Sequence, residues 1–317
     1  MLVDGKWEDD WQMGKRTDSQ GHYIRQESTF RHWVTPDGAA GPTGESGFKA
    51  EPGRYHLYIA LVCPWACRAL LYRKLKKLED VISLSISIPE FTDQGWAFGG
   101  DYPGSIPDPL YNIQYVHELY TRADPDLTGR PTVPVLWDKA QDTMVNNESA
   151  DIIRMFNSAF DAFGDASVDF YPEALRTEID ALNDRIYGAL NNGVYQTGFA
   201  ASQEAYDEAV AAVFNCLDDL ERRLEGQSYL LGERLTETDW RAFVTLIRFD
   251  VAYHGLFKCN LRRLTDYPNL SAYLKRLYDV PGVAETVDFD HIKRTYYSIK
   301  KVNPSRIFPK GPDKIFV

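Results

Sequence analysis

A run of apolar residues that ends in a cysteine and a proline constrains this chain most. Tyr55–Val62 alternates and then becomes continuously apolar, which predicts a buried strand. Pro64 is suited to the first turn of a helix, so a helix is predicted from Pro64 to about Lys77. Cys63 then lies at a helix N-terminus, where unpaired N–H groups and the helix dipole favour an anion. Such a position lowers the pKa of a thiol and supplies thiolate near neutral pH.

The alternative interpretation is that Cys63 is a structural thiol, because cysteines without a disulfide are often buried and inert. Cys67, Cys216 and Cys259 are the other cysteines, too few and too scattered for a disulfide framework in 317 residues. The sequence has no Cys-x-x-Cys pair and no His/Cys cluster at zinc spacing, so no metal is expected. Together these features favour a reducing, cytoplasmic compartment.

Length and composition narrow the class of protein. A chain of 317 residues is long enough for two domains, and 44% hydrophobic with 26% charged residues is typical of a soluble globular protein. No run of about 18 apolar residues occurs, and the first residues lack the basic-then-apolar order of a secretory signal, so no membrane association is expected. The net charge of −11 argues against a nucleic-acid partner, but not against an anionic small molecule in a local basic pocket.

The residues around the first strand suggest how the first domain is organised. Residues 1–50 show little periodicity and are interpreted as an irregular extension held to the body by Phe30, Trp33 and Phe48. Ile82–Ile88 alternates strictly, which predicts a second strand, parallel to the first through a βαβ crossover. Residues 89–130 are rich in Pro, Gly and Asp, with one helical patch near 113–122. They form a long insertion, and long insertions tend to be functional.

The rest of the first half completes a mixed sheet. Arg130–Trp137 predicts a strand with a proline near its start, and Thr143–Asn146 predicts its antiparallel partner. Glu148 and Ser149 then stand at the start of a helix, where acidic and hydroxyl residues cap free N–H groups. Two parallel strands followed by an antiparallel pair and a closing helix indicate an α/β domain over residues 1–165.

The second half, residues 166–317, is predicted to be all-α, with a C-terminal tail. Thr236-Glu-Thr-Asp239 matches a capping box at the start of one of its helices. Periodic apolar patterns predict helices at Ala174–Asn191, Gln203–Glu225, Glu237–Tyr253, Leu270–Asp279 and Asp288–Tyr296.

This combination of motifs resembles the cytosolic glutathione transferases: a thioredoxin-like α/β domain followed by an all-α domain. More narrowly, the chain resembles the glutathionyl-hydroquinone reductases, the Xi class of that family, almost from end to end. The segments that carry the resemblance are Trp33–Gly44, Tyr55–Arg68, Thr132–Trp137, Asn147–Asn157, Asn191–Tyr195 and Asn269–Ile292.

The resemblance implies that Cys63 is the nucleophile and that glutathione is the co-substrate. It also implies a cis bond at Val133-Pro134, which would present the Val133 backbone to a peptide. The γ-glutamyl end would bind Glu148 and Ser149 at the start of the next helix. Simple helix capping is the alternative explanation for these two residues, and both can hold at once. A guanidinium suits the glycyl carboxylate, and an indole suits packing on the peptide. The residues expected to bind glutathione are Trp96, Arg130, Pro131, Thr132, Val133, Glu148 and Ser149.

Tyrosines of the helical half match further positions of the family. The resemblance implies that Tyr195 is the acid/base partner of the leaving hydroquinone, and that Tyr253 and Tyr296 line the quinone site and help to hold the Cys63 thiolate. The chain has 19 tyrosines, so composition selects none of them, and Tyr297 is an alternative to its neighbour Tyr296.

The expected activity is reduction of S-glutathionyl-hydroquinones by glutathione through a mixed disulfide, by a homodimer. One alternative is another cysteine-type transferase, such as a dehydroascorbate reductase or a deglutathionylase; another is a non-catalytic binding module. The family usually has His four residues after the nucleophile, where this chain has Cys67. A packing role is favoured for Cys67 over a resolving one, because a bond between i and i+4 on a helix requires local unwinding.

Overall fold

The computed structural model describes residues 1–8 and 17–316. The described residues divide into two compact units. The first contains residues 1–8, Gln26–Asp169 and Glu285–His291, so a short segment late in the sequence belongs to the α/β unit. The second contains residues 17–25, Phe170–Ala284 and 292–316. The N-terminal extension therefore contributes to both units, and the part of it at residues 9–16 lies outside the described residues.

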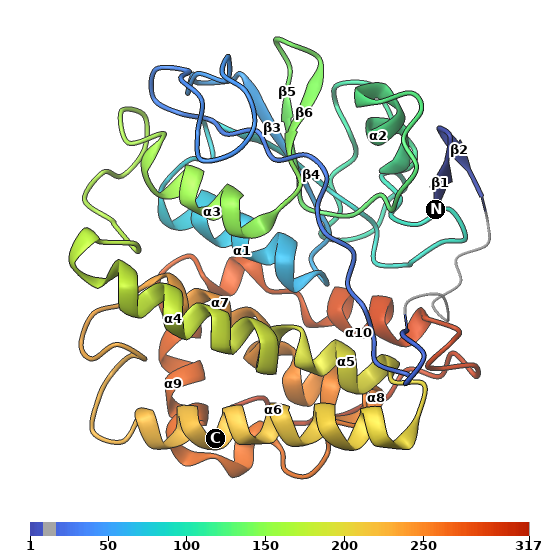
Figure 1. The fold of residues 1–317 in the computed structure, drawn as a ribbon, viewed down its shortest axis with the longest axis vertical. Coiled ribbons are helices and arrows are strands. Elements are labelled where there is room, and N and C mark those ends of the chain that lie inside the picture. Colours follow the sequence, from blue (N-terminus) through green and yellow to red (C-terminus); the bar gives the residue numbers. More distant parts are fainter. Residues whose placement is uncertain (9–16, 317) are drawn as a thin grey trace. The chain divides into compact units, whose positions relative to one another are not determined.

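The α/β unit is built on a mixed sheet. Within its described residues, the strands follow the order β4-β3-β5-β6 (Figure 1). Strand β3 pairs in parallel with β4, and antiparallel with β5, which in turn pairs antiparallel with β6. The predicted mixed sheet is thus confirmed. The strand bounds are Tyr55–Ile59 for β3, Ser83–Ile86 for β4, Val135–Asp138 for β5 and Thr143–Asn146 for β6.

Three strands are shorter than the apolar pattern suggests. The alternation predicts a strand over 82–88, but β4 covers only Ser83–Ile86, and beyond it the Ile88 N–H bonds the Ala97 carbonyl of the insertion at 2.9 Å. Strand β3 ends at Ile59 although residues 60–62 stay buried, because the chain turns there and the Cys63 N–H bonds the Ala60 carbonyl at 3.0 Å. Strand β5 begins only at Val135, after the proline, since proline has no N–H to donate to a sheet. An apolar pattern reports burial, and burial here extends beyond the hydrogen-bonded ladder.

Helices cover this sheet and its insertion. Helix α1 (Pro64–Leu75) packs against α3 (Ser149–Ser158), and α2 (His117–Ala123), the helical patch predicted in the insertion, lies beside β6 (Figure 1). In the extension, Phe48 is buried as expected, whereas Phe30 and Trp33 remain partly exposed. A hairpin of β1 (Leu2–Val3) and β2 (Lys6–Trp7), which periodicity does not reveal, also belongs to this unit.

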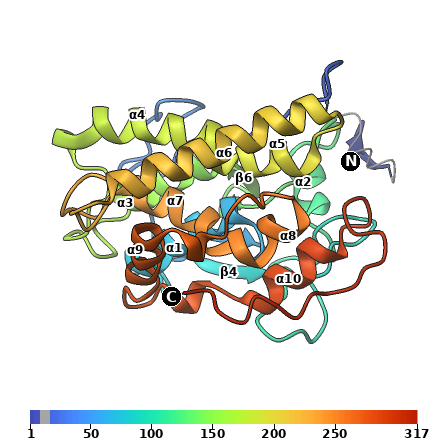
Figure 2. The same ribbon diagram turned by 90° about the horizontal axis from the view of Figure 1, so that it is seen from below.

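The second unit is helical, as predicted. Helix α7 (Glu237–Arg248) is its core helix, because every one of its residues is buried. It begins with the predicted capping box, in which Asp239 accepts hydrogen bonds from both the backbone and the hydroxyl of Thr236. The other helices include α4 (Arg176–Ile186), α5 (Gly193–Phe199), α6 (Gln203–Arg223), α8 (His254–Leu256), α9 (Pro268–Tyr278) and α10 (Phe289–Ser298). Helix α10 is divided, because Phe289–His291 belongs to the first unit and the rest of the helix to this one. Helices α5 and α6 lie side by side (Figure 2).

Two of the predicted helices are interrupted by π-helical turns. Tyr187–Asn191 separates α4 from α5, and Phe249–Tyr253 separates α7 from α8. Such turns shift the register of the side chains that follow and occur frequently at functional sites. None of the helices among the described residues combines the length and the apolar composition that a membrane span requires.

Candidate active site

The Cys63 thiol lies at the start of α1 and faces the loop before β5. Cys63 is the N-cap residue of α1 with an extended backbone, and Pro64 follows at the first helical position. The Cys63 Sγ lies 3.5 Å from the carbonyl oxygen of Val133, and the residue is 9% exposed. The thiol is therefore buried at a helix N-terminus, where free N–H groups and the helix dipole favour the thiolate form of a cysteine.

The loop opposite Cys63 contains the expected cis bond. The Val133–Pro134 peptide bond is cis. Val133 and Pro134 are buried, whereas Pro131 is partly buried and Thr132 is exposed. The backbone of Thr132 is held by the hydroxyl of Tyr120, which accepts a hydrogen bond from the Thr132 N–H at 3.0 Å and donates one to the Thr132 carbonyl at 2.9 Å. The position of this loop thus depends on a tyrosine of the insertion.

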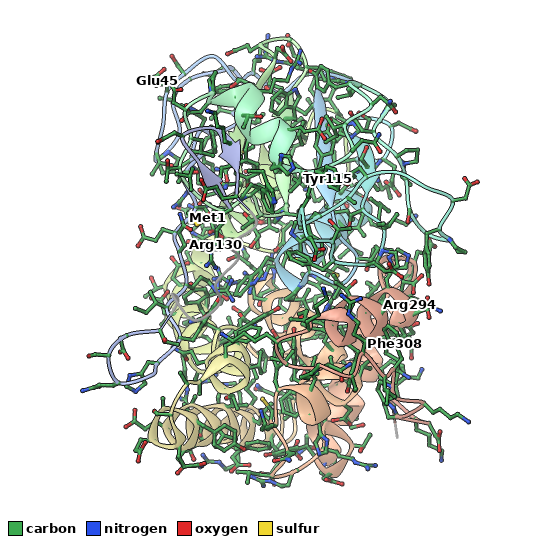
Figure 3. The ribbon with its side chains drawn as sticks, turned by 90° about the vertical axis from the view of Figure 1, so that its right-hand side faces the viewer. Met1, Glu45, Tyr115, Arg130, Arg294 and Phe308 are labelled. Atoms are coloured by element: carbon green, nitrogen blue, oxygen red, sulfur yellow. The ribbon has the colours of Figure 1, made fainter. Side chains whose placement is uncertain are left out.

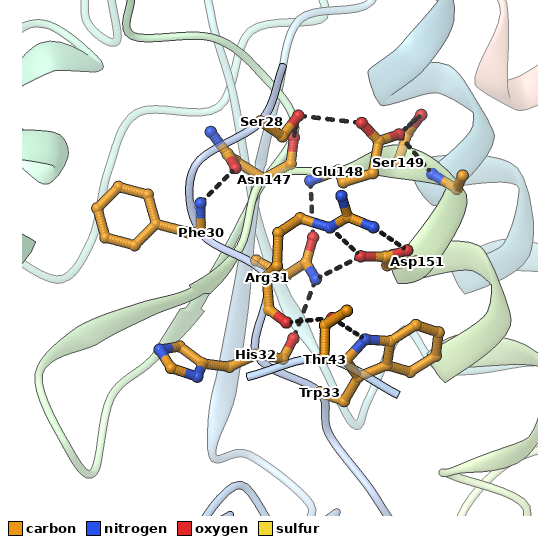
Figure 4. Close-up of polar contacts among 12 residues, drawn as sticks. Ser28, Phe30, Arg31, His32, Trp33, Thr43, Asn147, Glu148, Ser149 and Asp151 are labelled. Carbon is orange, nitrogen blue, oxygen red and sulfur yellow. Dashed lines mark hydrogen bonds and ion pairs between the residues drawn. The ribbon is translucent and has the colours of Figure 1, made fainter. Parts of the chain in front are cut away.

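Glu148 and Ser149 occupy the N-terminus of α3, as predicted. Glu148 is the N-cap residue, and its Oε1 accepts a hydrogen bond from the Ala150 N–H at 3.0 Å (Figure 4). The Ser149 hydroxyl is buried, 3.4 Å from the same carboxylate and 3.5 Å from a guanidinium nitrogen of Arg68. Capping therefore uses part of the hydrogen-bonding capacity of the Glu148 carboxylate. This carboxylate, the Ser149 hydroxyl and the N–H groups of α3 lie together and form a place where an amino-acid end group can bind.

The N-terminal extension supports this helix start, which the sequence does not reveal. The Ser28 hydroxyl donates to Glu148 Oε2 at 3.0 Å (Figure 4). Arg31 forms a two-point ion pair with Asp151 in the first turn of α3, and the Asn146 side-chain amide donates to the same carboxylate at 3.1 Å. The hydrogen bonds to Asp151 raise the pKa of Arg31 above its ordinary value.

Arg130 and Trp96 lie on segments of the insertion. Gly129, next to Arg130, pairs with Leu2 of the N-terminal hairpin through hydrogen bonds of 2.9 and 3.1 Å. Figure 3 labels Arg130 and Met1, which belong to the same unit. Trp96 is partly exposed, packs edge-on against Phe91 at 4.9 Å between ring centroids, and accepts the Val116 N–H at its carbonyl. Both side chains are thus anchored through their backbone or ring neighbours and remain partly exposed for a ligand.

Cys67 is a packed residue. Its side chain is 1% exposed, and its Sγ lies 3.8 Å from the carbonyl oxygen of Thr286, in the late segment that belongs to the α/β unit. None of the cysteines in the described part of the chain forms a disulfide. Across residues 1–8 and 17–316, no cluster of His, Cys, Asp or Glu side chains is arranged to hold a metal ion.

The helical unit brings its predicted tyrosines together. The Tyr296 hydroxyl lies 2.7 Å from the Tyr195 hydroxyl and 2.7 Å from the Tyr253 hydroxyl. Tyr253 ends the second π-helical turn, and it is fully buried, whereas Tyr195 is partly exposed. Tyr297 does not share these contacts; its hydroxyl lies near Gly255. Of the two neighbouring tyrosines, it is therefore Tyr296 that joins this tyrosine cluster (Tyr195, Tyr253 and Tyr296).

Charges and burial set the character of the tyrosine cluster. Burial and the two neighbouring phenols raise the pKa of Tyr296 well above its ordinary value, so it stays protonated. The Arg25 guanidinium lies 4.8 Å from the ring centroid of Tyr195 and donates to the side chain of Asn192 at 2.8 Å. A cation above an aromatic ring is attracted by its negative face, so Arg25 of the extension holds the Tyr195 ring in place.

Family models match both halves of the chain. The model for the N-terminal domain of glutathione S-transferase matches residues 62–159, and the model for the C-terminal domain matches residues 203–276. With a mixed four-stranded sheet in the described residues, a helical second unit and a cysteine at the start of α1, the fold is that of a glutathione transferase.

Relatives with assigned names narrow the family further. The chain is 53% identical to glutathionyl-hydroquinone reductase YqjG of Escherichia coli (strain K12), over 98% of this chain and 94% of the relative. It is 48% identical to glutathionyl-hydroquinone reductase PcpF of Sphingobium chlorophenolicum, over 98% and 96% of the two chains. The chain belongs to the glutathionyl-hydroquinone reductases, the Xi class of glutathione transferases, and the predicted family and fold class are confirmed.

Solved structures agree with this assignment. The glutathione-bound structure of YqjG, a glutathione transferase homolog from Escherichia coli K-12, superposes with a TM-score of 0.91 at 51% identity, covering 99% of this chain and 96% of that one. The glutathione-S-transferase Xi from Phanerochaete chrysosporium gives a TM-score of 0.89 at 48% identity, with 93% and 99% covered.

Proposed function

We propose that this protein uses glutathione to reduce S-glutathionyl-hydroquinones to free hydroquinones. The observation that carries the proposal is the Cys63 thiol at the N-terminus of α1, 3.5 Å from the carbonyl of Val133 beside the cis-proline. A thiol at a helix N-terminus suits attack on sulfur, because this position favours the thiolate. The named activity of two relatives that match this chain almost throughout supports the choice of substrate.

In the first half-reaction, the Cys63 thiolate attacks the sulfur that links glutathione to the hydroquinone ring. The sulfur–carbon bond breaks, and its electron pair stays on the ring carbon, which takes up a proton. The ring is thereby reduced and released, while the two sulfur atoms are oxidised to a disulfide between Cys63 and glutathione. The helix N-terminus stabilises the thiolate that begins this step.

In the second half-reaction, the thiolate of a second glutathione attacks the glutathione sulfur of the mixed disulfide. Glutathione disulfide leaves, and Cys63 returns as a thiolate. The proton lost by the second glutathione balances the proton taken up by the ring carbon. Because the two substrates react in turn through a covalent intermediate, ping-pong kinetics are expected.

Glutathione binding is assigned to the α/β unit. The backbone of Val133 pairs with the cysteinyl part of the peptide, and Arg130 binds the glycyl carboxylate. Glu148 receives the ammonium and Ser149, with the N–H groups of α3, the carboxylate of the γ-glutamyl end. Trp96 packs on the peptide, while Pro131 and Thr132 complete the loop.

The tyrosine cluster is assigned to the hydroquinone. Tyr195 is the proposed proton donor, because it is partly exposed while Tyr253 and Tyr296 are buried. When Tyr195 gives its proton to the ring carbon, its hydrogen bond to Tyr296 stabilises the phenolate left on Tyr195. Tyr253 and Tyr296 are proposed to line the quinone site.

Turnover with glutathionyl-menadiol, compared with turnover on dehydroascorbate, tests this function. We expect glutathionyl-menadiol to be much the better substrate, Cys63→Ser to be inactive, and mass spectrometry to find glutathione on Cys63 after one substrate has been added. Preferential turnover of dehydroascorbate would favour another cysteine-type transferase. Glutathione binding without any turnover would indicate a binding module.

The compartment, the oligomeric state and the metal requirement of the protein are also proposals. We propose a cytoplasmic homodimer that needs no metal, in keeping with cysteines that form no disulfide among the described residues. Sedimentation of the purified chain tests the dimer, and full activity after exhaustive dialysis against a chelator tests the independence from metal.

A further inference from the structure

The hydroxyl of Tyr120 has four hydrogen-bond contacts with two of the segments assigned to glutathione. It accepts from the Thr132 N–H at 3.0 Å, donates to the Thr132 carbonyl at 2.9 Å, accepts from the Asn147 side-chain amide at 3.0 Å, and lies 3.2 Å from the Thr132 hydroxyl. A phenol has one proton to donate and two lone pairs, so these contacts use its full capacity. Thr132 precedes Val133 of the cis-proline loop, and Asn147 precedes Glu148 at the start of α3.

These bonds determine how the Val133 backbone is presented. The Thr132 carbonyl and the Val133 N–H belong to one planar peptide unit, which is trans because it is not among the cis bonds of the described residues. In a trans unit the N–H points opposite to the carbonyl. Since the carbonyl points to Tyr120, the Val133 N–H points away from Tyr120. The next carbonyl, that of Val133, faces the Cys63 Sγ at 3.5 Å.

The same hydroxyl connects parts of the chain that lie far apart in sequence. Tyr120 belongs to α2 of the insertion, and its ring packs edge-on against Phe30 of the N-terminal extension, 5.9 Å between centroids. The Phe30 N–H donates to Asn147 Oδ1 at 3.1 Å, and the Asn147 N–H donates to the Phe30 carbonyl at 3.1 Å (Figure 4). Insertion, extension, cis-proline loop and α3 start therefore converge on this one side chain.

We propose that Tyr120 is a positioning residue for glutathione: its hydroxyl holds the Thr132–Val133 peptide plane so that the Val133 N–H meets the cysteinyl carbonyl of the bound peptide. Tyr120 is 1% exposed, so it touches no ligand itself and acts through Thr132. Burial raises the pKa of Tyr120, so the hydroxyl keeps its proton and its bond to the Thr132 carbonyl at every pH at which the enzyme works. This inference rests on the proposed function through the assignment of glutathione to this loop.

Tyr120→Phe tests the proposal because it removes the hydroxyl and keeps the ring. We expect the dissociation constant of S-methylglutathione, an unreactive analogue, to rise about tenfold by calorimetry, in line with the loss of a pre-set hydrogen bond. The KM for glutathione should rise by a similar factor, with kcat at saturation within about twofold, because binding rather than the attack by Cys63 is impaired.

Tyr55→Phe is the matched control. Tyr55 is also a fully buried tyrosine of the α/β unit, and its hydroxyl donates to the Lys49 carbonyl at 2.7 Å, away from the cis-proline loop. Both variants lose a buried hydrogen bond, so similar falls in melting temperature are expected, but only Tyr120→Phe should bind the analogue more weakly. Equal affinity in both variants would overturn the positioning role and leave Tyr120 a structural residue.

Asn147→Asp serves if Tyr120→Phe does not fold. An Asp keeps an acceptor for the Phe30 N–H but removes the amide that donates to Tyr120, so weaker binding of the analogue is again expected. Unchanged affinity in this variant would count against the proposal. If the wild-type protein itself does not bind S-methylglutathione, the proposed function fails; if it binds and both variants bind equally well, only the role of Tyr120 fails.

Discussion

The hydroxyl oxygens of Tyr195 and Tyr296 lie 2.7 Å apart, although 101 positions separate them in the sequence. Tyr296 also contacts the Tyr253 hydroxyl, so it is the middle member of a hydrogen-bonded chain of phenols. One end of the chain, Tyr195, is partly exposed, whereas Tyr253 and Tyr296 are buried. Linked hydroxyls of this kind can stabilise either protonation state of the phenol at the end of the chain, which is the role proposed for Tyr195.

Tyr296→Phe should therefore impair chemistry more than binding. The variant removes the central hydroxyl and leaves Tyr195 and Tyr253 without their common partner. We expect kcat for a glutathionyl-hydroquinone to fall about 10- to 100-fold, the range of a general acid–base contribution, with the KM for glutathione little changed. Steady-state kinetics over a range of pH measure both effects.

Tyr297→Phe is the control for this variant, since Tyr297 is the neighbouring phenol and lies outside the tyrosine cluster. It should leave kcat within about twofold of the wild type. Equal losses in both variants would show that the contact between Tyr195 and Tyr296 is structural only.

Cys67→Ser should keep the activity. Cys67 is buried, and its Sγ faces the Thr286 carbonyl, to which a serine hydroxyl can also donate. We expect turnover within about twofold of the wild type and a loss of stability of about 1 kcal/mol, measured by urea unfolding. A resolving cysteine would behave differently: its loss would slow the release of glutathione from Cys63, seen as accumulation of the mixed disulfide during turnover.

Buried His56 should make stability depend on pH. It lies on β3 between the hydroxyls of Ser83 and Ser85, at 2.7 and 2.9 Å, and burial lowers its pKa to about 4 from an ordinary 6.5. Between these values the unfolded chain binds more protons than the native one, so stability rises with pH. The contribution is complete above about pH 6.5 and is lost as the pH falls towards 4.

His56→Gln measures this effect, because glutamine does not titrate. Between about pH 7 and about pH 5, the wild type should lose roughly 2 kcal/mol more unfolding free energy than the variant. Urea unfolding at the two pH values gives both differences. Parallel losses in the two proteins would show that His56 takes up its proton without cost in the native state.

Asp239→Ala should be among the most destabilising substitutions in the helical unit. The buried Asp239 carboxylate accepts from the Thr236 backbone and hydroxyl, from the Leu230 N–H at 2.9 Å and from the Tyr273 hydroxyl at 2.8 Å. Alanine leaves these donors without their acceptor, at a cost of about 3 kcal/mol by chemical unfolding. Exposed Asp207 on α6 is the control, and Asp207→Ala should change stability by less than about 0.5 kcal/mol.

Short sequence patterns were sufficient to predict most of the helices and strands. The alternation at 82–88, the proline after Cys63 and the capping box at Thr236 are each legible within a few residues, and the structure confirms the strand, the helix start and the cap. The π-helical turns at Tyr187–Asn191 and Phe249–Tyr253 were not predictable, because each spans only five residues, too few for a change in the apolar periodicity to stand out.

The site was only partly accessible to such reasoning. Cys63 stands out because the apolar run before it and the proline after it predict a helix N-terminus at this position. Tyr120 carries no comparable signal: it is one of 19 tyrosines, in a patch whose periodicity is that of any short helix. Ser28 likewise gives no hint in the sequence that it reaches Glu148, 120 residues away.

Sequence periodicity, capping residues and the motif around Cys63 were enough to predict the fold class and the family, which are confirmed, and to select Cys63 as the proposed nucleophile, because each depends on residues that are neighbours in the chain. Which phenol of 19 meets which other, and which hydroxyl holds the Val133 loop, depend on contacts between segments distant in sequence. Such contacts are decided when apolar surfaces pack and leave particular polar atoms to satisfy one another. Tyr120 and Tyr296 owe their places to that packing, and only the folded chain shows them.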